Sequence, residues 1–166
     1  LTLESTPGCG STFSFVVPLG LVREEEKVLP EGVPVGSSGA LRGARLLLVE
    51  DHVVNRQVIR ELLERMGAEV QEAGNGREAV AAVARESFDG VLMDLQMPEM
   101  GGLEASRRIR ATHPDLVIIA LTASALEGDR RSCLEAGMND FVPKPIEPPV
   151  LFAKILEWLQ DAARRH

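Results

Sequence analysis

The sequence lacks the features that mark secreted, disulfide-bonded or membrane-spanning proteins. Its 166 residues include no tyrosine and one tryptophan, and aromatic residues make up 4%, so we expect an aliphatic core. The two cysteines, Cys9 and Cys133, form neither a disulfide framework nor a zinc motif. The longest nearly apolar run covers residues 116–126. A helix that spans a bilayer needs about 20 such residues, so this run predicts no membrane span.

The chain is also short of positive charge, with 18 Lys and Arg residues against 25 Asp and Glu residues and a net charge of −7. General nucleic-acid-binding proteins carry a basic surface, so we expect no nucleic-acid partner. We expect a soluble module of a reducing, cytoplasmic compartment that makes no membrane contact itself. The chain begins with Leu1 and shows no secretory signal. We expect it to be a piece of a longer protein, other parts of which are free to be membrane-anchored.

Composition divides the chain into three segments. Residues 1–20 end in a stretch of alternating polar and apolar residues, 12–17, which predicts a strand. Residues 21–44 combine a charge run, two prolines and a Gly-Ser-Ser-Gly stretch with no apolar period, which is typical of a flexible linker. Residues 45–166 are dense and regular, and they suffice for one hydrophobic core.

The third segment alternates strand and helix patterns five times. Short apolar runs predict strands over residues 45–49, 68–73, 91–93, 116–121 and 141–142. Helical spacing predicts helices over residues 54–66, 76–84, 103–111, 126–136 and 150–159, the second opening on the capping pattern Asn75 to Glu78. Strands that are apolar on both faces favour a parallel sheet. We therefore predict an α/β fold, a doubly wound five-stranded parallel sheet with helices on both faces, preceded by an irregular N-terminal segment.

Polar residues follow four of these strands directly. They are Glu50 and Asp51 after the first strand, then Asp94, Thr122 and Lys144. Right-handed crossovers bring the carboxyl ends of parallel strands to one edge of the sheet, where ligands of such sheets bind. Carboxylates 4 Å apart repel by about 4 kcal/mol per pair at an effective dielectric of about 20, so this cluster predicts a divalent cation.

The chemistry of these side chains favours phosphoryl transfer. Mg²⁺ takes oxygen ligands from one or two carboxylates together with phosphate oxygens, which matches this edge. Lys144 offers a positive charge and Thr122 a hydroxyl donor to a transferring phosphoryl group. Asp94 is the expected nucleophile, because carboxylates form covalent phosphoryl intermediates.

The same residues carry a resemblance to a known family. Residues 45 to about 159 resemble the receiver domain of two-component response regulators. The motifs that match are Leu48-Val49-Glu50-Asp51 with Asn55, Met93 to Gly102, Ala120-Leu121-Thr122-Ala123, and Phe141-Val142-Pro143-Lys144-Pro145. Gly101 departs from the pattern, since an Asp is common there, and we expect little consequence because the position lies outside the site.

The resemblance implies a role for each matching residue. Asp94 would accept a phosphoryl group from phosphohistidine on a histidine kinase or histidine phosphotransfer domain, and the switched surface would act on a downstream partner. Glu50, Asp51, Asp94 and the backbone carbonyl of Gln96 would hold Mg²⁺. Lys144 would pair with the phosphoryl group, and Thr122 and Phe141 would form the switch pair. The domain would promote its own phosphorylation, so whether to class it as an enzyme stays open.

The N-terminal segment resembles a different domain. Residues 6–19 are similar to the last glycine box and final strand of a histidine-kinase ATP-binding domain. A kinase remnant over 1–20, a linker over 21–44 and a receiver domain over 45–166 would be the layout of a hybrid sensor histidine kinase. The remainder of the nucleotide pocket is missing here, so we expect this chain not to bind or hydrolyse ATP.

Three other functions are weighed against the receiver. A phosphatase or mutase with an Asp nucleophile commonly has a second carboxylate two residues on, where this chain has Gln96. A flavodoxin-like cofactor binder would offer hydroxyls and amides to a phosphate in its first loop, whereas Glu50 and Asp51 in this loop would repel one unless a metal intervened. A degenerate receiver acting only as an interaction module would be expected to lack the acceptor, an acidic partner or the lysine, and all of these are present.

Overall fold

The computed structural model describes residues 2–6, 10–14, 39–123 and 127–165, with side chains described for 39–123, 130–162 and 164. The chain divides into two compact units, Leu1–Glu31 and Gly32–His166. Each is described by itself.

The first unit contains a two-stranded antiparallel hairpin. Its strands are β1 (Thr2–Thr6) and β2 (Gly10–Ser14), paired so that Leu3 lies opposite Phe13. The strand expected over residues 12–17 therefore begins at Gly10, and residues 15–17 lie outside the described part. The sequence analysis did not predict β1, because Leu3 is its only apolar residue and no apolar period marks it.

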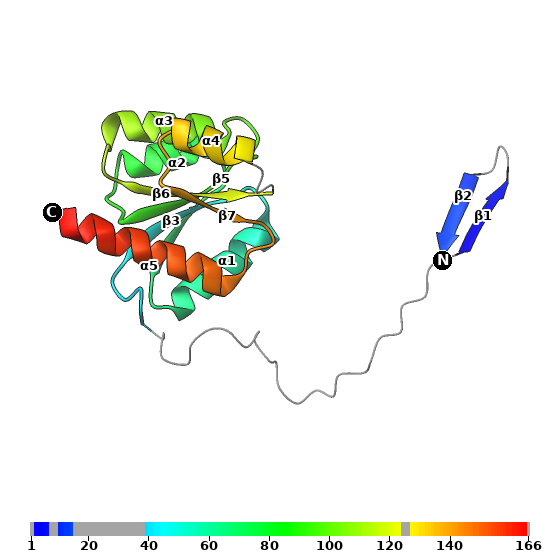
Figure 1. The fold of residues 1–166 in the computed structure, drawn as a ribbon, viewed down its shortest axis with the longest axis horizontal. Coiled ribbons are helices and arrows are strands. Elements are labelled where there is room, and N and C mark those ends of the chain that lie inside the picture. The colour runs from blue at the N-terminus through cyan, green and yellow to red at the C-terminus, as the bar shows by residue number, and fades with distance from the viewer. Residues whose placement is uncertain (1, 7–9, 15–38, 124–126, 166) are drawn as a thin grey trace. The chain divides into compact units, whose positions relative to one another are not determined.

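The second unit is built on the predicted sheet. Five parallel strands stand in the order β4-β3-β5-β6-β7 (Figure 1). Their bounds lie within one residue of the predicted strands: β3 (Arg45–Val49), β4 (Glu69–Ala73), β5 (Gly90–Asp94), β6 (Val117–Thr122) and β7 (Asp140–Pro143). The strand order reverses between β3 and β5, which makes the carboxyl ends of these two strands the switch point where ligands of such sheets bind.

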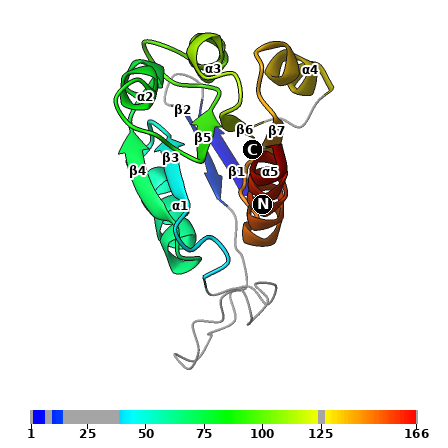
Figure 2. The ribbon, with the colours of Figure 1, turned by 90° about the vertical axis from the view of Figure 1, so that its left-hand side faces the viewer.

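Five helices connect and cover the strands. They are α1 (Val53–Arg65), α2 (Gly76–Val83), α3 (Gly102–Thr112), α4 (Glu127–Glu135) and α5 (Pro148–Arg165). Figure 2 shows α1 and α5 on one face of the sheet and α2, α3 and α4 on the other. The last helix is longer than predicted, because Ala162 continues the stripe that packs on the core. Leu126, where we expected the fourth helix to begin, lies outside the described residues.

Alternate strand residues face the two helical layers. Leu46 and Leu48 pack with Ile59 of α1 and Leu151 of α5, whereas neighbouring strand residues face the other layer. That second cluster contains Leu47, Val49, Val91, Met93, Ile118 and Ala120 from the strands with Ala79, Val83, Ala105 and Ile109 from α2 and α3. The period of two along a strand therefore explains why these strands are apolar throughout.

The compact unit begins before Arg45, which corrects the linker boundary predicted at residue 44. Leu41 is 2% exposed and packs in the core beneath α1 and α5. Its amide donates a hydrogen bond to the carbonyl of Met66 at 2.9 Å. The carbonyl of Ala44 accepts from the Glu69 amide at 2.8 Å, so residues 41–44 are tied to the end of α1 and the start of β4.

The N-cap predicted at Asn75, at the start of α2, is confirmed. The Asn75 side chain accepts a hydrogen bond from the Glu78 amide at 2.9 Å. Glu78 in return accepts from the Gly74 amide at 2.6 Å and from the Asn75 side-chain amide at 3.0 Å. The Asn75 bond satisfies an amide that the first turn of a helix leaves unpaired, and the Glu78 bonds hold the two residues that join β4 to α2.

Candidate functional site

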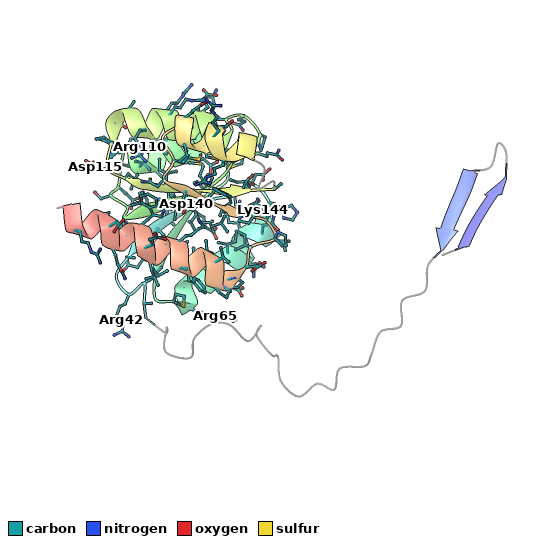
Figure 3. All side chains as sticks on the ribbon, viewed as in Figure 1. Arg42, Arg65, Arg110, Asp115, Asp140 and Lys144 are labelled. Carbon is teal, nitrogen blue, oxygen red and sulfur yellow. The ribbon has the colours of Figure 1, made fainter. Side chains whose placement is uncertain are left out.

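Four neighbouring strands deliver polar side chains to the carboxyl edge of the sheet. Glu50 follows β3, Asp94 ends β5, Thr122 ends β6 and Lys144 follows β7. Glu50, Asp94 and Thr122 are buried, which is unusual for polar residues at the ends of strands. Figure 3 labels Lys144 at this edge and Asp115 at the opposite edge of the sheet. The predicted site residues are therefore brought together.

Lys144 bridges the two buried carboxylates. Its Nζ donates to Glu50 Oε2 at 2.6 Å and to Asp94 Oδ2 at 2.7 Å. Burial alone would lower the pKa of the Lys144 ammonium, but the hydrogen bonds and charges of Asp94 and Glu50 raise it above its ordinary value. Lys144 is therefore a fixed positive charge between two carboxylates.

The remaining carboxylate oxygens are held by the loops that follow β3 and β5 and by the first turn of α1. Glu50 Oε1 accepts from the His52 amide at 3.2 Å and from Asn55 Nδ2 at 3.4 Å. Asp94 Oδ1 accepts from the Gln96 amide at 3.1 Å. Both carboxylates thus have a defined orientation, which a pre-organised reaction site requires.

Asp51 completes an acidic cluster that could hold a metal ion. Glu50, Asp51 and Asp94 each offer a carboxylate oxygen, and these atoms lie within 4.8 Å of one another. Glu50 and Asp94 are buried whereas Asp51 is exposed, so the cluster opens to solvent on one side. An all-oxygen donor set with an open side suits Mg²⁺, which keeps several waters when bound by protein carboxylates.

Thr122 ends β6, the strand next to the one that carries Asp94, and Phe141 lies one strand further on, in β7. Leu121 pairs with Asp94 across β5 and β6, and Phe141 pairs with Ala120 across β6 and β7. The Thr122 carbonyl accepts from the Lys144 amide at 2.7 Å, which links the end of β6 to the segment that carries the lysine.

A charged cluster surrounds Phe141. Lys154 Nζ lies 5.4 Å from the centre of the Phe141 ring and 2.6 Å from Asp140 Oδ2. The same oxygen accepts from Trp158 Nε1 at 3.2 Å (Figure 3 labels Asp140). Burial alone would raise the pKa of Asp140, but hydrogen bonds from Lys154, the Phe141 amide and Trp158, with the Lys154 charge, lower it. This cluster connects the ring of Phe141 to α5.

Sequence reasoning missed Arg56, which contacts the acidic loop from α1. Its Nη1 donates to the carbonyl of Glu50 at 2.7 Å. Nothing in the sequence singles out Arg56, because an arginine on an amphipathic helix is ordinarily a solvated surface charge. A cation near a helix N-terminus is unfavourable unless a separate partner holds it there.

A sizeable hollow lies away from these residues. A cavity of about 680 Å³ is lined by Ala44, Asp89 and Leu116, which precede β3, β5 and β6, and by Phe88 and His113. It therefore opens at the amino ends of the strands. The carboxyl edge is the better candidate, because that is where buried charges and hydrogen bonds converge.

Comparison with known proteins agrees with the class that this fold and site define, an α/β phosphoryl-accepting domain. The family model described as "Response regulator receiver domain" matches residues 46–156. The chain belongs to the response regulator receiver domain family. The resemblance predicted from the motifs is therefore confirmed, and the chain is a phosphorelay receiver domain.

Two curated relatives are sensor kinases. Sensor protein GacS of Pseudomonas syringae pv. syringae is 41% identical over 146 residues, covering 84% of this chain and 16% of that protein. Hybrid signal transduction histidine kinase K of Dictyostelium discoideum is 32% identical over 159 residues, covering 86% of this chain and 13% of that protein. The chain thus spans less than a fifth of the length of these relatives.

Two solved structures are similar to more than two thirds of this chain. One is the receiver domain of a sensor histidine kinase of Pseudomonas aeruginosa PAO1 with magnesium coordinated in its active-site cleft. It is 42% identical with a TM-score of 0.67, covering 71% of this chain and 98% of that one. The other is the Ssk1 receiver domain with the phosphotransfer protein Ypd1 of Saccharomyces cerevisiae. It is 33% identical with a TM-score of 0.66, covering 69% of this chain and 88% of that one.

None of the helices in the described part of the chain is both long enough and apolar enough to cross a membrane.

Proposed function

We propose that Asp94 accepts the phosphoryl group of a phosphohistidine. A carboxylate oxygen of Asp94 attacks phosphorus, the P–N bond breaks, and its electron pair returns to the imidazole, which takes a proton from solvent. The observation that carries this role is the position of Asp94: a buried carboxylate, paired with Lys144, beside two further acids. Catalysis of phosphoryl transfer depends on such positioning and charge neutralisation.

The acidic cluster fits Mg²⁺, with Glu50, Asp51, Asp94 and the backbone carbonyl of Gln96 as its ligands. The bound ion would supply neutralisation of the negative charge on the phosphoryl oxygens. Lys144 would then exchange a carboxylate partner for a phosphoryl oxygen, which its flexible stem allows. Gln96 occupies the position where a phosphatase would carry its general acid, so the phosphoryl group is expected to persist on Asp94.

The degenerate alternative has no support in this site. The acceptor, both acidic residues and the lysine are all present, and three of these four side chains are joined by ion pairs of 2.6 and 2.7 Å. A domain that only bound partners would have no need to keep two carboxylates buried, because burial of charge is costly.

The test of this function is labelling by a small phosphodonor such as acetyl phosphate. We expect the 166-residue chain to take up phosphate when Mg²⁺ is present and to lose the label in hydroxylamine, which cleaves acyl phosphates. Equal labelling in the presence of a chelator, or a label that resists hydroxylamine, would contradict the assignment.

The phosphodonor is expected to dock on the start of α1. Val53, Val54 and Val58 are 64%, 61% and 53% exposed, and α1 begins two residues after Asp51. An exposed apolar patch beside a reaction site indicates a protein interface. A histidine phosphotransfer domain or a kinase would present its phosphohistidine here. The co-crystal structure of Ypd1 with the Ssk1 receiver domain is an example of such a pair.

We propose that the parent protein is a cytoplasmic-facing hybrid sensor histidine kinase. Support comes from the sensor-kinase relatives and from the β1–β2 hairpin, which lies in the segment that resembles the end of a kinase ATP-binding domain. In this layout residues 1–20 are the kinase remnant, a linker follows, and the receiver domain extends to residue 166. The domain would act on a downstream target that its switched surface recognises.

Thr122 and Phe141 are proposed as the switch that carries phosphorylation to the surface. A phosphoryl group on Asp94 adds about −1.5 to −2 charges, and the Thr122 hydroxyl can donate to it. Movement of Thr122 would make room beside β6 for the Phe141 ring. The ring would then move away from the Lys154 ammonium, which it contacts in this structure. Trp158 shares Asp140 with Lys154 and is the chain's one tryptophan, so its fluorescence should report this change.

We therefore expect the phosphoryl mimic beryllofluoride with Mg²⁺ to shift the Trp158 emission. Thr122→Ala should remove most of that shift while Asp94 still accepts phosphate, because the variant loses the hydroxyl and not the nucleophile. Thr112→Ala, at the far end of α3, is the control and should respond like the parent. An unchanged shift in Thr122→Ala would contradict the switch.

A further inference from the structure

Arg56 ties the acidic loop to the edge of the sheet. Its Nη1 donates to the Glu50 carbonyl at 2.7 Å, and its Nε lies 3.6 Å from Glu72 Oε2 on β4. The side chain is 20% exposed, so its guanidinium is largely enclosed between α1, the loop and β4. An arginine held on both sides in this way keeps a fixed direction, because its planar fork loses little freedom per bond.

The bond to Glu50 reaches Asp51 through the peptide between them. The Glu50 carbonyl belongs to a rigid planar unit that ends at the Asp51 Cα. Every other polar group of Glu50 is also held: its amide donates to Ala73 at 3.1 Å, and its carboxylate binds Lys144, His52 and Asn55. The Arg56 bond therefore acts on the end of Glu50 that leads into Asp51.

Asp51 needs such support more than its neighbours do. It is exposed, and no hydrogen bond or ion pair holds its carboxylate among the side chains described for this unit. Glu50 and Asp94, in contrast, are buried and paired with Lys144. The direction of Asp51 thus depends on the backbone from which it leaves.

We propose that Arg56 is a positioning residue for the metal site: it holds the Glu50–Asp51 peptide so that the Asp51 carboxylate faces Glu50 and Asp94. This inference rests on the proposed function, since it takes the acidic cluster to be the site of Mg²⁺. It assigns Arg56 no contact with the metal or the phosphoryl group.

Positioning and charge predict opposite effects when Arg56 is removed. A guanidinium near the cluster repels a divalent cation, so loss of its charge alone would tighten Mg²⁺ binding. Loss of the peptide anchor would weaken binding, because Asp51 would have to be ordered when the metal arrives. The sign of the change therefore separates the two roles.

The experiment compares Arg56→Met with Arg60→Met in the full chain. Arg60 lies one turn further along α1 and pairs with Glu72 at 3.3 Å and Glu64 at 3.8 Å, with no contact to Glu50 or Asp51 among the described residues. It is thus a matched control for loss of charge and of the Glu72 pair. Mg²⁺ affinity is measured by titration followed by amide spectra, without a phosphodonor.

We expect Arg56→Met to weaken Mg²⁺ binding about five- to tenfold and Arg60→Met to change it less than twofold. Arg56→Lys keeps the charge and can reach only one partner at a time. Its Mg²⁺ affinity should lie between those of Arg56→Met and the parent. In the metal-free protein, the His52 amide should exchange with solvent faster in Arg56→Met, since the loop that presents it to Glu50 is loosened.

Two results would overturn the inference. Mg²⁺ affinity in Arg56→Met that equals or exceeds the parent's would show that the peptide anchor is dispensable. Equal weakening in Arg60→Met would assign the effect to the shared Glu72 pair. Failure of the proposed function would look different, because the parent chain itself would then show no Mg²⁺ binding and no labelling.

Discussion

Asp94→Asn is expected to lower incorporation of phosphate from a small phosphodonor at least 100-fold. The amide keeps the shape of the side chain and its acceptor oxygen, but it lacks the carboxylate that forms the covalent bond to phosphorus. The loss should therefore be in chemistry, with the fold retained. Measurement of bound phosphate against time at saturating Mg²⁺ gives the ratio of rates.

Asp115→Asn is the matched control for the loss of one aspartate. Asp115 is exposed and precedes β6 at the opposite edge of the sheet (Figure 3). The Asp115→Asn variant should incorporate phosphate at the parent's rate. Residual labelling of Asp94→Asn above a tenth of the parent's rate would place the nucleophile elsewhere.

Gly102→Ala is expected to destabilise the domain by about 3 kcal/mol or more, near the upper end of the range for overpacked cores. Gly102 is the first residue of α3 and packs directly against the strand that carries Asp94. A Cβ at this position would overlap the Asp94 carbonyl oxygen and would lie 2.9 Å from Met93 Cγ. Backbone cannot rearrange as a side-chain tip can, so α3 would have to move away from β5. Urea unfolding of parent and variant measures the difference.

Gly101→Ala provides the comparison at the adjacent glycine. A Cβ there would lie 3.2 Å from the Leu95 carbonyl oxygen, and Gly101 has an ordinary φ of −70°. We expect a cost of about 1 kcal/mol or less, since a small shift relieves this contact. Equal destabilisation by the two substitutions would contradict the argument from close packing at Gly102.

The sheet and the site edge could be predicted because buried parallel strands have a direct sequence signature. Leu47 and Leu48 point to opposite helical layers, so both must be apolar, and the apolar run ends at Val49, where the buried acid Glu50 follows. The meeting of Asp94 and Lys144, 50 residues apart, follows from the rule that parallel strands end at one edge. That rule does not predict the ion pairs of 2.6 and 2.7 Å that Lys144 forms with Glu50 and Asp94.

Other features had no local signal. Leu41 lies in a stretch of glycines, alanines and arginines with no apolar period, and only its contact with the end of α1 shows that it belongs to the core. The strand β1 is stabilised by pairing with β2, a non-local interaction that its own composition does not reveal. Arg56 reads as one surface charge of an amphipathic helix until the Glu50 carbonyl is seen to lie against it.

The central claim is that Asp94 is the residue that carries the phosphoryl group. Reduction of the phosphorylated chain with borohydride converts an aspartyl phosphate to homoserine, and mass spectrometry of the peptides locates it. The account predicts homoserine at position 94 and unmodified Glu50 and Asp51. Reduction at either of those two acids, or a phosphate carried by His52 beside them, would contradict it.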